Sequence, residues 1–135
     1  IWQTGKYYNA EMNKAVSDFG EIPNLKVLDF ITDMGAAYNA ADLVISRAGA
    51  SSISEFCLIG KPVILVPSPN VAEDHQTKDA AVYVKDSEAP EMLLKRALEI
   101  VNDNAKLESL STNIKKLGLP NSADVIADEV LKLVR

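Results

Sequence analysis

The chain has 135 residues, which is typical of one domain and enough to bury a hydrophobic core. Hydrophobic residues make up 47% and charged residues 24%, as in ordinary globular proteins, and the net charge of -5 argues against a nucleic-acid-binding surface. The single cysteine, Cys57, excludes an intrachain disulfide, and the longest apolar run, 62–67, is too short to span a bilayer. The first residues lack the pattern of a signal peptide, so we expect a soluble cytoplasmic domain taken from a larger protein.

Short apolar runs alternate with segments of helical periodicity, which predicts an α/β fold with a parallel sheet. In chain order, the strands are expected at 1–4, 24–31, 42–47, 62–67 and 80–84, and the helices at 10–19, 34–41, 51–59, 91–102, 106–117 and 122–134. The unbroken Val-Ile-Leu-Val of the fourth strand predicts burial on both faces. Gly60 is expected to cap the helix before that strand, and Pro90 suits the first turn of a helix.

Parallel α/β sheets bind ligands at the carboxyl ends of their strands, and three such loops here carry suitable residues. They are 4–5, 30–34 and 47–52. In the third loop, Gly49 and Ala50 let the backbone approach a ligand, while Ser51 and Ser52 supply hydroxyls. Because the helix that follows offers unpaired N–H groups and a partial positive charge, this loop predicts a phosphate site without a basic patch.

Ser52 and Glu55 have the spacing of a capping box, which would satisfy helix-end donors and do nothing more. Alternatively, the Glu55 carboxylate holds a pair of sugar hydroxyls, as acidic residues do for ribose in dinucleotide folds. Local sequence leaves both interpretations open.

The other reactive residue types give weaker signals. His75 has no Cys or His partner at metal-ligand spacing, so we expect no metal and no other cofactor. Cys57 lies between apolar neighbours and is expected to be a buried small hydrophobe. Trp2, in the opening strand, is expected in the core, and the acidic run 86–91 is expected to be a solvated loop.

Five segments in order resemble the MurG family of bacterial glycosyltransferases. They are IWQTGK (1–6), FITDM (30–34), AADLVISRAGASSISE (40–55), GKPVILVP (60–67) and EDHQTK (73–78). The resemblance implies that residues 1–135 are the C-terminal donor-binding domain of a GT-B fold. Its Rossmann-like parallel sheet would be flanked by helices, with its first strand and the N-terminal acceptor domain missing before Ile1.

This family transfers GlcNAc from UDP-GlcNAc to lipid I, which makes lipid II for peptidoglycan. The implied partners are therefore UDP-GlcNAc and, through the missing domain, lipid I and the inner face of the bacterial cell membrane, with no nucleic acid. The implied reaction is inverting and metal-independent. Its catalytic base would lie in the missing domain, so no catalytic residue is expected here and the chain alone is expected to bind donor without turnover.

The resemblance also assigns donor-binding roles by position. Phe30 and Ile31 would face the uracil beside Met34, with main-chain hydrogen bonds from Ile31. The diphosphate, sugar and ribose contacts would come from six further residues: Thr4, Gly49, Ala50, Ser51 and Ser52 for the diphosphate and sugar, and Glu55 for the ribose hydroxyls. Gln76 would hold the GlcNAc hydroxyls, with His75 next to it.

One segment departs from the family pattern, and two alternative functions stay open. After Lys78 the chain is short by roughly two helical turns. A UDP-GlcNAc 2-epimerase shares the fold, but a Ser-Gly-Gly turn and paired glutamates would be expected where Ala48-Gly49-Ala50 and a lone Glu55 stand. A non-catalytic donor-binding subunit of a two-chain lipid-linked GlcNAc transferase is the other alternative.

Overall fold

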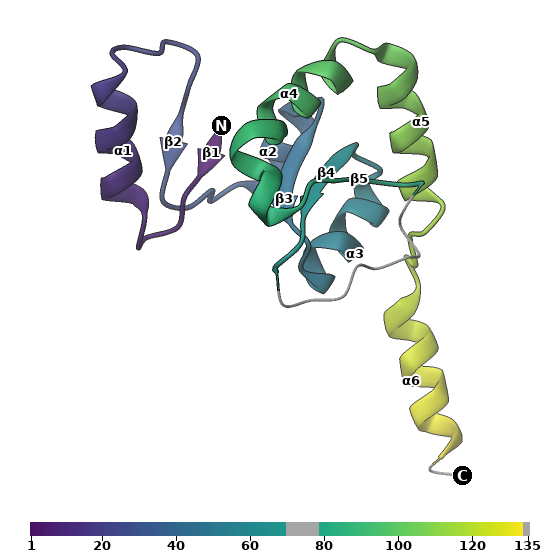
Figure 1. Ribbon diagram of the computed structural model, residues 1–135. Helices are drawn as coiled ribbons and strands as arrows, with labels where there is room; N and C mark the ends of the chain where they lie inside the picture. The colour runs from purple at the N-terminus through teal and green to yellow at the C-terminus, as the bar shows by residue number, and fades with distance from the viewer. Residues whose placement is uncertain (70–78, 134–135) are drawn as a thin grey trace. The chain divides into compact units, whose positions relative to one another are not determined.

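The computed structural model describes residues 1–69 and 79–133 (Figure 1). These residues form two compact units, one of residues 1–41 and the other from residue 42 onward. Each unit contains parallel strands and helices, so the predicted α/β class is confirmed. The strands form two sheets, one of two strands and one of three, where the sequence predicts one sheet.

The first unit is a βαβα arrangement. Its elements are β1 (Trp2–Gln3), α1 (Asn9–Asp18), β2 (Val27–Leu28) and α2 (Met34–Ala40). The two strands are parallel, with Trp2 opposite Val27 and Gln3 opposite Leu28. Gly5, with φ of 74°, supplies the left-handed turn that leads from β1 toward α1. The strand predicted at 24–31 is thus reduced to the two residues that pair with β1.

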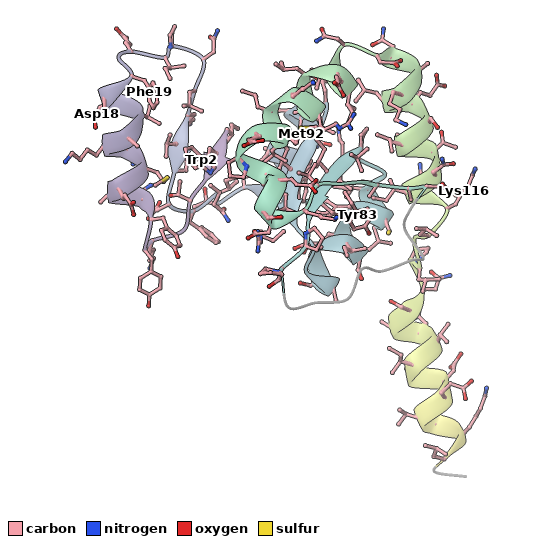
Figure 2. The ribbon with its side chains drawn as sticks, in the orientation of Figure 1. Trp2, Asp18, Phe19, Tyr83, Met92 and Lys116 are labelled. Carbon is pink, nitrogen blue, oxygen red and sulfur yellow. The ribbon has the colours of Figure 1, made fainter. Side chains whose placement is uncertain are left out.

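Large apolar side chains remain accessible in the first unit. Trp2 is 41% exposed, so its expected place in the core is wrong for the described chain. Phe19, at the end of α1 (Figure 2), is 86% exposed. Neither α1 nor α2 contains a buried residue.

The second unit is built on a three-stranded parallel sheet of order β3-β4-β5. Its elements are β3 (Val44–Arg47), α3 (Ala50–Ile59), β4 (Val63–Val66), β5 (Val82–Tyr83), the 3-10 helix η2 (Asp86–Glu88), α4 (Ala89–Val101), α5 (Asn104–Lys115) and α6 (Ser122–Lys132). All four residues of β4 are at most 5% exposed, which confirms the strand predicted to be buried on both faces. Within the described residues, no helix is long and apolar enough to cross a membrane.

A hydrophobic core joins the central strand to α4 and α5. Its buried members are Ile64, Val84, Ala97, Ile100 and Leu110. The half-buried side chain of Met92 in α4 (Figure 2) packs against them. Because side chains alternate along a strand, Val63 and Leu65 point to the opposite face from Ile64, and both are fully buried. The sheet is therefore covered on both faces.

Helices α3 and α5 pack closely at the end of α3. Gly60 ends α3 in the left-handed conformation, with φ of 66°, as its predicted C-cap role requires. The Ser111 hydroxyl donates a hydrogen bond of 2.7 Å to the Gly60 carbonyl oxygen. Beyond α5, a Cβ atom at Gly118 would lie 2.9 Å from the Cys57 carbonyl oxygen, so this approach requires a glycine.

The acidic run 86–91 is helical, which corrects the predicted loop. Asp86–Glu88 form η2, and α4 begins directly after it with Pro90 in its first turn. Acidic residues suit the positive end of a helix, and Glu88 also pairs with Lys85 at 3.7 Å. The side chains of this run are still largely exposed, as expected.

Candidate functional site

The junction between β3 and α3 has a glycine that its own backbone does not need. Gly49 is the N-cap of α3, with φ of −82° and ψ of 141°, an extended conformation open to any residue. Among the described residues, the nearest atom to a Cβ at Gly49 would be Ser52 Oγ at 3.8 Å, an ordinary contact. Neither backbone strain nor packing of the described chain therefore explains a glycine here.

The first turn of α3 presents unpaired donors. In the described part of the chain, the N–H groups of Ala50, Ser51 and Ser52 have no acceptor, and Ile53 makes the first backbone hydrogen bond, to the Gly49 carbonyl at 2.9 Å. Ala50 and Ser51 are exposed and Ser52 is half-buried. An anion placed at this turn would meet several N–H groups and the positive end of the helix dipole.

Two other helices of the chain satisfy their first turns with an aspartate. Asp33 accepts from the Ala36 N–H at 2.8 Å at the start of α2, and Asp103 accepts from the Lys106 N–H at 3.0 Å at the start of α5. Helix α3 has no side-chain cap, and Ser52 lies inside its first turn rather than at the N-cap. The capping-box interpretation of Ser52 and Glu55 is therefore wrong, because a capping box requires the serine at the N-cap.

An ion pair lies at the same edge of the sheet as this turn. Arg47, the last residue of β3, donates a hydrogen bond to the Asp86 carboxylate, which follows β5. The two side chains are 59% and 43% exposed, so water screens their attraction. Sequence reasoning did not pair these residues, since only the order β3-β4-β5 brings the carboxyl ends of β3 and β5 to one edge.

The first unit presents a second set of predicted site residues. Phe30 is 62% exposed, and Met34 begins α2 with its side chain half-buried. The N–H of Ile31 donates a hydrogen bond of 2.8 Å to Gln3 Oε1, so the main-chain donor assigned to uracil has an internal acceptor. Gln3 was missed in the sequence, because a glutamine at a strand end carries no signal of its own.

Thr4 is held by its neighbours at the carboxyl end of β1. Its Oγ1 lies 3.2 Å from the carbonyl oxygens of Gly5 and Leu28, and it accepts a hydrogen bond of 3.2 Å from Asn9 Nδ2. The hydroxyl is therefore ordered beside the loop that leaves β1.

The remaining predicted residues lie on α3 or outside the described chain. Glu55 is exposed in the second turn of α3. His75 and Gln76 lie outside the described residues. Across residues 1–69 and 79–133, no group of three or more His, Cys, Asp or Glu side chains is placed to hold a metal ion.

The buried face of α3 carries the only cysteine. Cys57 is 5% exposed, which confirms its prediction as a buried small hydrophobe. Desolvation by burial raises the pKa of its thiol. A thiol held neutral in this way is a poor nucleophile, so Cys57 supports packing rather than chemistry.

Comparison with known proteins gives one consistent family. The family model described as the glycosyltransferase family 28 C-terminal domain matches residues 1–128. In the crystal structure of Acinetobacter baumannii MurG, the matching part has a TM-score of 0.80 at 27% sequence identity, covering 96% of this chain and 42% of that one.

Two curated relatives share the name UDP-N-acetylglucosamine--N-acetylmuramyl-(pentapeptide) pyrophosphoryl-undecaprenol N-acetylglucosamine transferase. The one from Bacteroides thetaiotaomicron is 64% identical over 98% of this chain, and the one from Flavobacterium psychrophilum is 47% identical over 99%. The chain spans only 38% of the length of each relative. A match to the Bacteroides fragilis protein runs to 143 positions, more than the 135 residues present here, so that relative carries residues without a counterpart in this chain.

Proposed function

Because this chain belongs to the glycosyltransferase family 28 C-terminal domain family, we propose that it is the donor-binding domain of a GlcNAc transferase. The enzyme would move GlcNAc from UDP-GlcNAc to the lipid-linked MurNAc-pentapeptide, lipid I, and so form lipid II at the inner face of the bacterial cell membrane. The names of the relatives support the reaction. The acceptor site and the membrane contact would belong to the part of the longer relatives that this chain does not match.

The first turn of α3 carries the proposal. Among the described residues, neither backbone strain nor packing requires a glycine at position 49, and the three N–H groups that follow it have no acceptor. A diphosphate fits this arrangement, since its oxygens accept hydrogen bonds and its charge is stabilised by the helix dipole. Side chains larger than hydrogen at Gly49 would stand where the phosphates approach.

The same donors would act in the chemical step. The acceptor hydroxyl attacks the anomeric carbon as the bond to the β-phosphate oxygen breaks, and the electron pair of that bond leaves with UDP. A base outside this chain takes the hydroxyl proton, and attack opposite the leaving group inverts the anomeric centre. Negative charge grows on the β-phosphate, and preorganised N–H groups at α3 stabilise it without a metal ion.

The remaining donor contacts are proposed from the resemblance to the family, position by position. Exposed Phe30, the main chain of Ile31 and Met34 would receive the uracil, and the Glu55 carboxylate would accept hydrogen bonds from the ribose hydroxyls. Thr4 would reach the diphosphate. Gln76, with His75 beside it, would contact the GlcNAc hydroxyls.

Calorimetric titration of the chain with UDP-GlcNAc, UDP and GDP, each with and without EDTA, tests the proposal. We expect UDP-GlcNAc and UDP each to bind with the same affinity in the presence and absence of EDTA. GDP should bind more weakly than UDP. Binding that is abolished by EDTA would contradict the metal-independent site. Equal affinity for GDP and UDP would contradict uracil recognition, and the absence of any binding would overturn the proposed function.

A further inference from the structure

The side chain of Gln3 spans the carboxyl ends of the two strands in the first unit. Gln3 ends β1, and its Oε1 accepts the N–H of Ile31, three residues beyond β2, at 2.8 Å. The hydrogen bond is exposed to solvent, as is the Gln3 side chain. Phe30, next to Ile31, presents 62% of its surface. An exposed aromatic residue is thus followed directly by a backbone donor, and a side-chain carboxamide accepts from that donor.

A carboxamide offers the same pattern of groups as one edge of uracil. Its carbonyl oxygen is an acceptor, like O4 of the uracil ring, and its neighbouring NH₂ is a donor, like N3–H of that ring. Cytosine presents a donor, its N4 amine, at the position where uracil presents the O4 acceptor. A base that stacks on Phe30 can therefore accept a hydrogen bond from the Ile31 N–H only if it carries a carbonyl oxygen at the position of uracil O4.

We propose that the Gln3 carboxamide occupies the base site of the ligand-free domain and is displaced by uracil, which makes Gln3 a residue that sets the affinity of the site for uracil. The Ile31 N–H has one hydrogen, so Gln3 and a base carbonyl compete for it. An exposed carboxamide returns to water at little cost, so the exchange is reversible and lowers the apparent affinity by the occupied fraction. The inference rests on the proposed function, because it assigns the base of the donor to this place.

The test compares Gln3→Ala and Gln3→Met with the parent chain, using uridine and cytidine as ligands in NMR titrations. Methionine keeps the volume of the side chain and removes the competing acceptor. Asn13→Ala is the matched control, because it removes another exposed carboxamide of the same unit, one that bonds to Asn9 within α1. We expect both Gln3 variants to bind uridine about two- to fivefold more tightly, the range of one weak exposed hydrogen bond. Cytidine binding and the Asn13→Ala variant should stay at the parent's level.

Amide hydrogen exchange at Ile31 measures the contact itself. Without ligand, exchange should be faster in both Gln3 variants than in the parent, and saturating uridine should slow it equally in all three. Weaker uridine binding in the variants would mean that Gln3 contacts the base directly, and unchanged binding would mean that it only braces the strands. Either result overturns the inference while the proposed function stands. If neither uridine nor UDP-GlcNAc binds the parent, the proposed function fails and the inference fails with it.

Discussion

Gly49 and Glu55 represent two kinds of residue-scale contribution to the candidate site. In the proposed site, Gly49 would act through the absence of a side chain, in a backbone conformation that any residue can adopt. Glu55 would act through its carboxylate, on an exposed turn of the same helix. Substitutions at the two positions therefore test space and charge separately.

Gly49→Val should lower UDP affinity at least about tenfold, or about 1.4 kcal/mol, because its methyl groups occupy the space of the phosphates. Affinity for uridine should not change, since the proposed base contacts are at Phe30 and Ile31. Calorimetry with both ligands measures the difference. Equal losses for UDP and uridine would show that the junction is structural.

Gly49→Ser separates stability from binding at the same position. A serine N-cap accepts from the first-turn N–H groups, so the free energy of unfolding should rise by a few tenths of a kcal/mol. The same hydroxyl competes with the diphosphate, so UDP affinity should fall. A more stable variant with unchanged UDP affinity would argue against a phosphate at these donors.

Glu55→Ala should weaken UDP-GlcNAc binding by about 1.5–3 kcal/mol, the scale of a lost charge-assisted hydrogen bond. Its unfolding midpoint in urea should stay close to the parent's, because the side chain is exposed and polar interactions at the surface contribute little to stability. Glu108→Ala, at an exposed position of α5, removes the same charge and should leave binding unchanged. A variant that binds normally but unfolds at lower urea would assign Glu55 to stability alone.

At the scale of elements, α3 is held by α5 through its buried face and its C-terminus. Phe56 and Cys57 are buried on α3, and Ile114 of α5 is fully buried. The Ser111 hydrogen bond to Gly60 and the close approach of Gly118 to Cys57 join the same two helices. This packing fixes the helix whose first turn forms the candidate phosphate site.

Gly118→Ala should reduce the free energy of unfolding by about 1–3 kcal/mol, as other overpacked sites do. Its Cβ would lie 2.9 Å from the Cys57 carbonyl oxygen and 3.2 Å from that of Lys115, and neither backbone atom yields easily. Gly35→Ala in α2 is the control, because its nearest contact would be an ordinary 3.5 Å. Urea denaturation compares the two, and equal stability would show that the end of α5 relaxes without cost.

The raised thiol pKa of Cys57 predicts how stability depends on pH. The folded chain holds the thiol proton more tightly than the unfolded chain, so this contribution is fully present below the unfolded pKa of about 8.5. It decreases as the pH rises from there through the folded pKa. In Cys57→Ala, the free energy of unfolding should fall less between pH 8 and 10 than in the parent, and identical slopes would contradict the assignment.

At the scale of the whole molecule, the chain spans about two fifths of the relatives that it matches. Donor binding can therefore be measured on this chain alone, whereas group transfer is expected to require residues outside it. Incubation of the chain with UDP-GlcNAc and lipid I should release no UDP above the spontaneous rate, because the proposed base lies outside these residues. Release of UDP that depends on the acceptor and is lost in Glu55→Ala would contradict this prediction.

The sequence by itself determined the order and type of most elements. Alternation of apolar runs with helical periodicity predicted the parallel strands, and the run 63–66 predicted a strand that is buried throughout. Gly60 and Pro90 marked helix ends through backbone chemistry that acts within a few residues. The resemblance in motif order also predicted the family that the comparisons found, since motifs are local stretches of sequence.

Only the tertiary structure decided the contacts between segments distant in sequence. The hydrogen bond from Ile31 to Gln3 spans 28 residues, and the pair of Arg47 and Asp86 spans 39. Each depends on strand order and register, which no local pattern specifies. The start of α3 at Ala50 was equally undecided, because Ser52 and Glu55 fit a cap as well as a ligand. The backbone conformation at Gly49 excluded the capping box, since it places the N-cap at Gly49 and Ser52 inside the first turn; the ligand role of the two residues stays a prediction.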